Sequence, residues 1–560
     1  QVINSMRFFK ASFIKLLLVF TFTGFIPNLP AVETKQPNII LIVADDLGYS
    51  DLGVYGSEIR TPNLDTIAQQ GIQLTNYHTG PTCGPTRAML MTGIDNHRAG
   101  LGTNSAALRR LPELKGLPGY EGYLNDRVIP FSKILNEGGY HTFMAGKWDL
   151  GKIKGKLPTD QGFDRYFGIA DGGGSHFSDG RGTFAGQQMA TYFEDGKSVT
   201  KLPDDFYSSE SYTDHVLDYI DSAPNDGNPF FAYLAYTAPH WPLQVPDEWI
   251  EKYKGIYDSG WEEIRKNRFE RQKELGILES DVNLSPMNRA VKNWADLPVF
   301  QKQIELKRIE LHAAMVELMD FHIGRLIEYI ETNIERETII IFVSDNGAEG
   351  NAIGEVGDNK YWIPATFDNR LENMGKRDSY VWLGAGWANA MVSPFRNYKS
   401  YTTEGGIKTP AIFYSTKGRF KKNTKNSIMT VMDIAPTILD IAKLEHPQEK
   451  ETNLLPMTGR SALDYLTNKT ESVHGNKPIG WELYGNRALI KGEFKAVLIW
   501  PPEGNGEWQL YNIIKDPTEN NNLAKSHPSV LNELITDWQG YAEINGVAII
   551  DEDIGYGRYQ

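Results

Sequence analysis

The sequence predicts an α/β fold, in which a large, mostly parallel sheet is flanked by helices and followed by a smaller C-terminal domain with an antiparallel sheet. Uninterrupted apolar runs are typical of strands that are covered on both faces, and helical patterns lie between them. After about residue 451, short apolar runs are separated by Gly and Asn turns, as in an antiparallel sheet. With 560 residues, the chain also exceeds what one hydrophobic core supports.

Four apolar runs predict strands of the large sheet, at residues 38–43, 142–145, 229–238 and 339–343. Polar side chains follow each run, in chain order Asp45 and Asp46, then Lys147 and Asp149, then His240, and finally Asp345 and Asn346. Ligands bind outside the carboxyl ends of the strands in such sheets, so we expect these groups to meet at one edge. Any one of them alone could instead be a helix cap or a turn residue.

Helices are predicted between these strands. One covers residues 62–70, with Thr61 as its cap, Pro62 in its first turn and Gly71 at its end. Another covers about 303–330, where apolar residues recur on one face. Residues 247–298 are rich in Lys, Glu and Arg and predict a solvated helical insertion over the sheet, either a lid or a plain surface excursion.

The domain limits follow from changes in composition. Residues 1–32 comprise a predicted signal peptide and the residues upstream of it, with Arg7, Lys10 and Lys15 before an apolar run and a cleavage site near Ala31; the alternative is an uncleaved anchor. Residues 33–450 form the predicted catalytic domain and 451–560 a C-terminal α/β subdomain. We therefore expect a periplasmic or secreted protein with no stable membrane insertion after cleavage.

Composition limits the classes of function. Hydrophobic residues make up 41% and charged residues 23% of the chain, which excludes a disordered or coiled-coil protein. The net charge of −14 argues against nucleic acid as a partner. A single cysteine, Cys83, excludes an intramolecular disulfide and a cysteine-based zinc site.

Cys83 is predicted to lie at the N-terminus of a helix that has Pro85 in its first turn and ends at Gly93. The helix N-terminus favours an anion there, and Arg87 lies one turn further on the same side. The alternative for a lone cysteine is an inert buried thiol.

Residues 83–93 resemble the sulfatase family signature, Cys-x-Pro-x-Arg followed by Thr-Gly. The motifs VADDLGYSD, GKWDLG, APHWPL, SDNGAEG and YKSYTTEGGIKTP follow in the order of that family, and the chain looks most like bacterial periplasmic arylsulfatases. The resemblance implies an alkaline phosphatase-like fold with a large mixed sheet. It also implies that Cys83 is oxidised to formylglycine, whose hydrate is a geminal diol, by a formylglycine-generating or anaerobic sulfatase-maturating enzyme.

The family pattern assigns the remaining site residues. Asp45, Asp46, Asp345 and Asn346 would bind Ca²⁺ together with the diol at position 83, since all offer hard oxygen donors. The sulfate oxygens of a small-molecule ester would be bound by Lys147, Lys399 and His240. The leaving group would be protonated by Lys399 or His240. Arg87 belongs to the same catalytic group. One diol oxygen would attack sulfur, and deprotonation of the second would expel sulfate.

Asp149 departs from the family pattern, which has His at this position to take the proton of the diol. A carboxylate could serve as that base, but its charge beside sulfate is unfavourable. The leading hypothesis is hydrolysis of aryl sulfates, with an aromatic wall from Tyr123, Trp148, Trp241 and Tyr380. The alternatives are a carbohydrate sulfatase, a phosphonate or phosphodiester hydrolase, and a sulfate-ester-binding protein that has lost turnover through Asp149.

Overall fold

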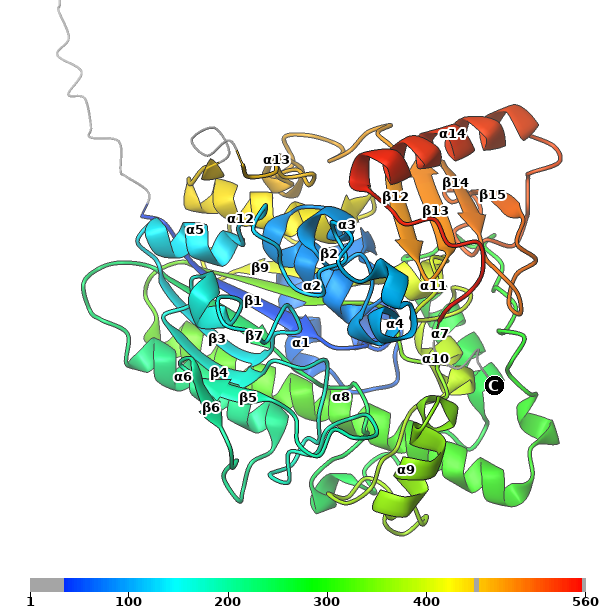
Figure 1. Ribbon diagram of the computed structural model, residues 1–560, viewed down its shortest axis with the longest axis horizontal. Coiled ribbons are helices and arrows are strands. Elements are labelled where there is room, and N and C mark those ends of the chain that lie inside the picture. Colours follow the sequence, from blue (N-terminus) through cyan, green and yellow to red (C-terminus); the bar gives the residue numbers. More distant parts are fainter. Residues whose placement is uncertain (1–34, 448–452, 556–560) are drawn as a thin grey trace, which may run out of the picture. The chain divides into compact units, whose positions relative to one another are not determined.

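The computed structural model describes residues 35–447 and 453–555, so the predicted signal peptide lies outside the described residues. An 11-stranded sheet dominates the chain, in the order β10-β2-β9-β8-β1-β7-β3-β4-β5-β6, with β11 paired to β2 (Figure 1). Its centre is parallel and contains the four predicted strands, here β8 (Thr338–Ser344), β1 (Asn38–Ala44), β7 (Phe230–Ala235) and β3 (His141–Lys147), followed by β4 (Arg165–Ile169). The prediction of a mostly parallel centre is confirmed.

The outer strands make the sheet mixed. On one side, β9 (Lys408–Ser415) runs antiparallel to both β8 and β2 (Ile72–His78), while β10 (Asn423–Lys425) and β11 (Met429–Thr430) run parallel to β2. On the other side, β5 (Tyr192–Glu194) and β6 (Lys197–Val199) are antiparallel. The mixed sheet that the family resemblance implied is therefore present.

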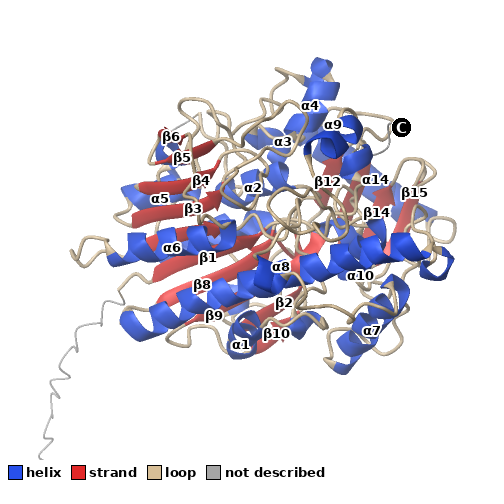
Figure 2. Cartoon of the chain, turned by 90° about the horizontal axis from the view of Figure 1, so that it is seen from below, coloured by secondary structure: helices blue, strands red, loops and turns tan. Residues whose placement is uncertain are grey.

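Helices cover both faces of this sheet (Figure 2). Side chains of β1 alternate between two cores, because successive residues of a strand point to opposite faces. Ile40 and Ile42 pack in one core with α1 (Pro62–Gln70), α6 (Ser208–Asp221) and α8 (Val299–Asn333). Ile39, Leu41 and Val43 pack in the other core with α2 (Cys83–Thr92), α5 (Phe131–Glu137) and α12 (Ile434–Ala442). With both faces covered, the strand ends are the part of the sheet left for a site.

The predicted helices form, with differences at their ends. α1 starts at Pro62 as expected, but Thr61 makes no cap with its side chain; its hydroxyl instead donates to Asp65 Oδ1 at 3.1 Å. α8 is longer than predicted and begins directly after Pro298. The remaining helices are α3 (Asn96–Ala99), α4 (Ser105–Arg110), α7 (Trp261–Glu274), α9 (Asn359–Thr366), α10 (Ala385–Met391), α11 (Glu404–Ile407), α13 (Leu463–Leu466) and α14 (Pro528–Asn545).

The charged region 247–298 is less solvated than its composition indicates. It contains α7 and two short 3-10 turns, Asp247–Trp249 and Trp294–Asp296. Arg268 on α7 is buried and donates to Asp51 Oδ1 at 2.7 Å and to Glu58 Oε1 at 2.7 Å. These ion pairs fix α7 to the segment that follows β1, so the expectation of a purely solvated helix is wrong for this face of α7.

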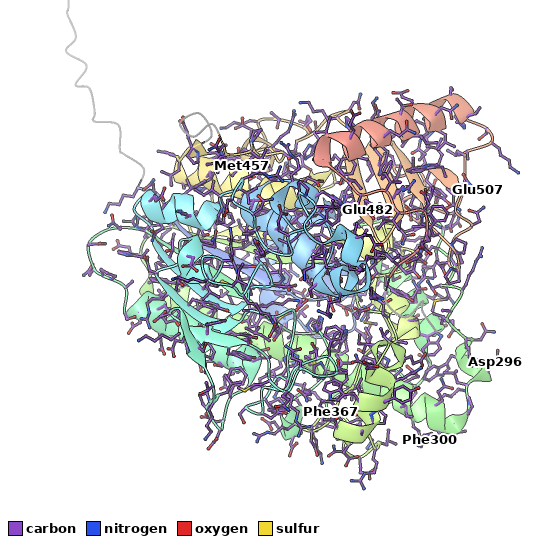
Figure 3. All side chains as sticks on the ribbon, viewed as in Figure 1. Asp296, Phe300, Phe367, Met457, Glu482 and Glu507 are labelled. Atoms are coloured by element: carbon purple, nitrogen blue, oxygen red, sulfur yellow. The ribbon has the colours of Figure 1, made fainter. Side chains whose placement is uncertain are left out.

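A second, four-stranded sheet lies in the C-terminal region, as predicted. Its strands β12 (Ile479–Leu483), β13 (Asn486–Lys491), β14 (Phe494–Leu498) and β15 (Trp508–Asn512) are antiparallel neighbours in chain order, and α14 packs on them. Glu482, labelled in Figure 3, accepts a hydrogen bond from His97 Nε2 at 3.0 Å. His97 Nδ1 lies 2.9 Å from Asp95 Oδ1, so the two carboxylates hold one imidazole between them.

The residues from Gln36 onward form one compact unit. The division into domains at residues 33, 450 and 451 therefore stays a prediction from the sequence. Within the described residues, no helix combines the length and apolar content that crossing a membrane requires.

Candidate active site

The carboxyl ends of the central strands bring the predicted polar groups together. Asp45 and Asp46 directly follow β1, and β1 lies between β7 and β8, which lead to His240 and to Asp345. Lys147 is the last residue of β3, on the far side of β7. Cys83 begins α2 and is buried, with 7% of its surface exposed. The convergence expected from the sequence is therefore present.

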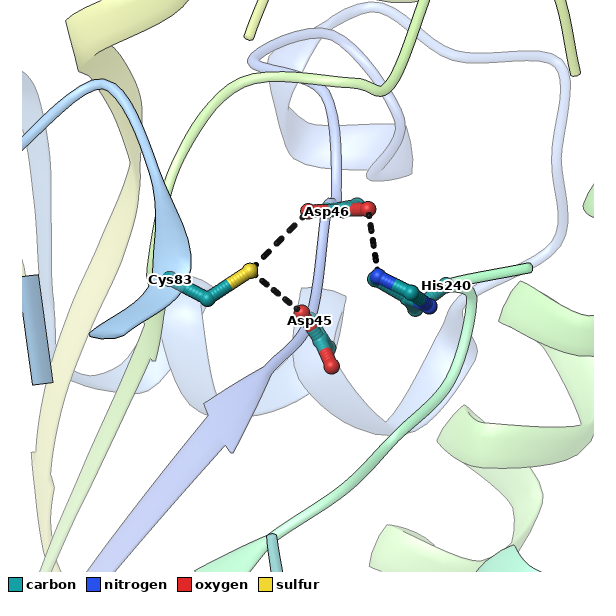
Figure 4. Close-up of side chains that lie close together, drawn as sticks. All are labelled: Asp45, Asp46, Cys83 and His240. Carbon is teal, nitrogen blue, oxygen red and sulfur yellow. Dashed lines mark hydrogen bonds and ion pairs between the residues drawn. The ribbon is translucent and has the colours of Figure 1, made fainter. Parts of the chain in front are cut away.

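Cys83 points into a buried acidic cluster (Figure 4). Its Sγ lies 3.3 Å from Asp45 Oδ1 and 3.7 Å from Asp46 Oδ1, while His240 Nε2 lies 3.7 Å from Asp46 Oδ2. One ligand atom from each of these four residues lies within 4.8 Å of the others. Asp46 has a left-handed backbone, with φ of 66°, a conformation that costs a non-glycine residue about 1 kcal/mol. The fold accepts this strain at the site.

Asp345 and Asn346 border the same cluster. The backbone N–H of Asp46 donates to Asp345 Oδ1 at 3.1 Å, and Asn346 Nδ2 donates to Asp46 Oδ1 at 2.7 Å. Asn346 Oδ1 is buried and has no hydrogen-bond partner within residues 35–447 and 453–555. A buried amide oxygen without a partner is costly unless a ligand satisfies it. Carboxylates with an open amide oxygen form a donor set that suits a hard divalent cation, so the residues present fit a calcium ion.

Three buried cations balance the carboxylates. Lys147 Nζ donates to Asp45 Oδ2 at 2.8 Å, and Lys399 Nζ donates to the two oxygens of Asp46 at 2.7 and 2.9 Å. Arg87 Nε donates to Asp345 Oδ2 at 3.0 Å. Each carboxylate thus has its own cation, and two of those cations are lysines.

Burial governs the protonation of the cluster. Burial raises the pKa of Asp45 to about 8, although Lys147 opposes the shift. Burial also acts on Asp46, but the charges of Lys399 and Lys147 outweigh it and lower the pKa of that carboxyl. Burial and the neighbouring carboxylates raise the pKa of the Cys83 thiol well above its usual value. Since the thiolate is the nucleophilic form of cysteine, this shift makes the unmodified side chain a poorer nucleophile.

His240 is held as a neutral imidazole. Its Nδ1 lies 2.6 Å from the carbonyl oxygen of Trp241 and donates to it, and burial lowers the pKa of the ring well below its usual value. Nε2 is then the unprotonated nitrogen, and it faces Asp46.

Asp149 lies beside this cluster with a left-handed backbone, φ 56°. Its Oδ2 is 4.0 Å from Lys147 Nζ, and a quarter of its side chain is exposed. Burial raises the pKa of this carboxyl, while Lys147 opposes the shift. Asp149 is thus a carboxylate of raised basicity at the border between the buried cluster and solvent.

A pocket of about 570 Å³ opens over the cluster. Its lining includes Cys83, Asp149, His240 and Lys399, together with the aromatic rings of Tyr123, Phe184 and Trp241. Two of the four expected aromatic residues therefore line the pocket.

The other two expected aromatic residues do not line it. Trp148 is fully buried and donates Nε1 to the carbonyl of Lys156 at 2.9 Å. Tyr380 is buried behind Trp241, with 5.9 Å between the ring centroids. The expectation of a four-residue aromatic wall is wrong for these two positions.

Glu349 is a pocket residue to which the sequence assigned no role. Its Oε2 lies 3.2 Å from Lys399 Nζ, and its Oε1 accepts the backbone N–H of Asn351 at 2.7 Å. Burial raises the pKa of this carboxyl, and Lys399 opposes the shift. Glu349 lies within the motif SDNGAEG, four residues after Asp345. Its position in a polar loop at the end of a strand was the one sequence feature that could have indicated a role in the site.

Comparisons with known proteins indicate the family of the chain. The family model described as Sulfatase matches residues 37–444. The chain is 42% identical over 541 residues to an uncharacterized sulfatase of Schizosaccharomyces pombe, covering 93% of this chain and 96% of the relative. It is 38% identical over 436 residues to an arylsulfatase of Klebsiella aerogenes, covering 77% and 92%. The crystal structure of Ps i-CgsB is similar with a TM-score of 0.65 at 25% identity, covering 92% and 95%, and that protein has also been solved with k-i-k-neocarrahexaose.

Proposed function

Because this chain belongs to the sulfatase family and is a sulfuric ester hydrolase, we propose that it hydrolyses aryl sulfates to a phenol and inorganic sulfate. The observation that carries the proposal is the position of Cys83 Sγ, which lies 3.3 Å from Asp45 at the base of a pocket with aromatic side chains. The arylsulfatase of Klebsiella aerogenes, at 38% identity, supports the choice of an aryl ester.

We propose that residue 83 acts as formylglycine. The buried thiol of Cys83 is protonated at neutral pH and is a poor nucleophile, so the unmodified chain is expected to have almost no activity. Hydrated formylglycine would supply two oxygens at this position, one to attack sulfur and a second whose deprotonation releases sulfate. A formylglycine-generating or anaerobic sulfatase-maturating enzyme is then a required partner of the nascent chain.

We further propose that Asp45, Asp46, Asp345 and Asn346, with the oxygen at position 83, hold a calcium ion. The unpartnered Asn346 Oδ1 and the all-oxygen donor set support this choice of metal. When bound, the ion would supply positive charge that polarises the sulfate and stabilises the charge developing on it.

The chain's own residues would bind and protonate the substrate. Lys147 and Lys399, which pair with Asp45 and Asp46, would bind sulfate oxygens. Lys399 is also the better proton donor to the leaving oxygen, since the Nε2 of His240 carries no proton in this arrangement. Asp149 would take the proton of the second oxygen at position 83, the task of the family histidine.

A carbohydrate sulfatase is the second candidate. The pocket of about 570 Å³ also carries polar side chains, among them Asn104 and Gln187, which suit sugar hydroxyls. The similarity to Ps i-CgsB, which has been solved with k-i-k-neocarrahexaose, favours the same possibility. Location in the periplasm or outside the cell stays a prediction from the N-terminal residues.

The test is to express the full chain with a maturation enzyme and to determine the mass of the peptide that contains Cys83. The aldehyde form should accompany turnover of nitrophenyl sulfate, and Cys83→Ala should abolish it. Full activity with only unmodified thiol would refute the proposed nucleophile. Faster turnover of sulfated sugars would favour the second candidate, and much faster turnover of phosphodiesters or phosphonates would overturn the sulfatase assignment of this site. A matured protein that binds sulfate esters without turnover would be a binding protein.

A further inference from the structure

A continuous aromatic wall runs from the cluster to an arginine. The ring of Trp241 lies 4.2 Å from that of His240, and Phe184 packs edge-on against Trp241 at 5.8 Å. The guanidinium of Arg109 lies over the ring of Phe184, at 5.5 Å from its centroid. All four residues line the pocket that contains Cys83. Arg109 therefore belongs to the same pocket as the reacting position and lies at the opposite end of this row of rings from His240.

Arg109 is an exposed cation without a counter-ion in the described part of the chain. No carboxylate lies within ion-pair distance of its guanidinium among residues 35–447 and 453–555, and the group rests on the face of Phe184. Lys152, another cation of the pocket lining, differs, because its Nζ donates to Asp171 at 2.6 Å. The charge of Lys152 is neutralised, whereas that of Arg109 is available to a ligand.

The wall is also longer than a single-ring substrate needs. If Lys399 holds the sulfate at residue 83, the first ring of the ester would lie in the pocket that Trp241 lines, and Phe184, packed against Trp241, would offer a surface for a second ring. Beyond that surface, a planar guanidinium matches a carboxylate or sulfate group through paired hydrogen bonds. The pocket thus combines a reacting end with a distal end of positive charge.

We propose that Arg109 and Phe184 form a distal anion subsite, so that the enzyme prefers sulfate esters of two-ring size that carry a second negative charge far from the reacting sulfate. This inference rests on the proposed function and adds the class of substrate to it. Arg109 is a specificity residue here, since it would contact the substrate but not the reacting atoms.

The experiment compares biphenyl sulfate with the same ester bearing a carboxylate on the far ring. For the matured enzyme, we expect the KM of the carboxylated ester to be about fivefold lower, as for one partly exposed ion pair, with similar kcat. Arg109→Gln should remove this preference and leave the kinetics of nitrophenyl sulfate unchanged. Arg109→Lys should retain part of it. Arg110→Gln is the matched control, because Arg110 lies on the same helix but not in the pocket lining.

A binding measurement separates recognition from chemistry. The chain with unmodified Cys83 should bind the carboxylated ester more tightly than biphenyl sulfate by the same factor in calorimetry, and Arg109→Gln should equalise the two affinities. A disaccharide monosulfate compared with its disulfated counterpart tests whether the second anion belongs to a sugar.

Two outcomes would overturn the subsite, namely equal KM values for the two biphenyl esters in the parent enzyme, or an Arg109→Gln variant that keeps the preference. Either outcome leaves nitrophenyl sulfate turnover intact. Failure of the proposed function is distinguishable, because the matured chain would then hydrolyse neither nitrophenyl sulfate nor the two biphenyl esters.

Discussion

Replacing Asp149 by Asn tests whether a carboxylate has taken over the role of the family histidine. The amide keeps the size of the side chain but cannot accept a proton. General base catalysis contributes roughly 100- to 10,000-fold to a rate. A quarter of the side chain is exposed, so water can partly replace the base. We therefore expect kcat to fall by about 100-fold, near the lower end of that range.

The same change should improve binding of the substrate. Asp149 Oδ2 lies 4.0 Å from Lys147 Nζ, a group that would bind sulfate, so its negative charge opposes the anion and competes for the lysine. Two unit charges at this distance interact by about 4 kcal/mol near a protein surface, and solvent at a partly exposed group reduces that to about 1 kcal/mol. KM for nitrophenyl sulfate should thus decrease by about fivefold while kcat falls.

The assay is stopped-flow release of nitrophenol from the matured enzyme. If Asp149 serves only the second half of the reaction, Asp149→Asn should give a rapid burst of about one nitrophenol per site followed by slow turnover. Asp171→Asn is the control, since that carboxylate lines the same pocket but pairs with Lys152. An unchanged kcat in Asp149→Asn, or an equal loss in Asp171→Asn, would refute the role assigned to Asp149. If the parent is nearly inactive and Asp149→His raises its rate strongly, the natural protein has lost turnover and binds sulfate esters without hydrolysing them.

Three further predictions concern the structure that supports the site. Lys495 is buried, and its Nζ lies 2.7 Å from Glu404 Oε1 and 2.8 Å from Glu519 Oε1. Lys495→Met would leave these carboxylates without this cation, so it should lower the free energy of unfolding in urea titrations by about 3 kcal/mol. A loss below about 1 kcal/mol would contradict this. Burial lowers the pKa of His97, but hydrogen bonds to its two carboxylate partners outweigh burial and raise it from 6.5 to about 9. The stabilisation by protonated His97 is therefore complete below pH 6.5 and is lost as the pH rises toward 9, by up to a few kcal/mol. Over this pH range, the melting temperature of the parent should fall more than that of His97→Gln. Parallel curves of melting temperature against pH for the two proteins would argue against this role. Gly146 has φ of 110°, and a Cβ at this position would lie 1.8 Å from a carbonyl oxygen of β7. Gly146→Ala should therefore lower the free energy of unfolding by about 3 kcal/mol. An unchanged melting temperature of this variant would show that β3 can shift to make room.

Most of the site could be predicted because its residues stand at the ends of buried strands. A run such as that of β1 has no polar alternation, so its central position and the direction of its carboxyl end follow from the sequence. The convergence of Asp45 and Asp345 could therefore be expected from the order of residues alone. The helix that starts at Cys83 was equally predictable from its proline and its terminal glycine.

What the sequence did not reveal depends on where side chains point and on distant partners. Trp148 follows the last residue of β3, and its indole is buried and hydrogen-bonded to the carbonyl of Lys156, a contact in an irregular segment that the sequence pattern does not indicate. Glu349 lies in an irregular loop, where no periodicity indicates which side chain turns back toward Lys399. Arg268 was expected in solvent because its partners are more than two hundred residues away.

The central claim is that loops from distant parts of the chain hold one divalent cation beside residue 83. Calorimetric titration of chelator-treated protein with Ca²⁺ tests it directly. We predict one ion bound per chain, with a rise in melting temperature, and much weaker binding in both Asp46→Asn and Asn346→Ala. Absence of binding by the folded parent, or unchanged affinity in both variants, would contradict the account.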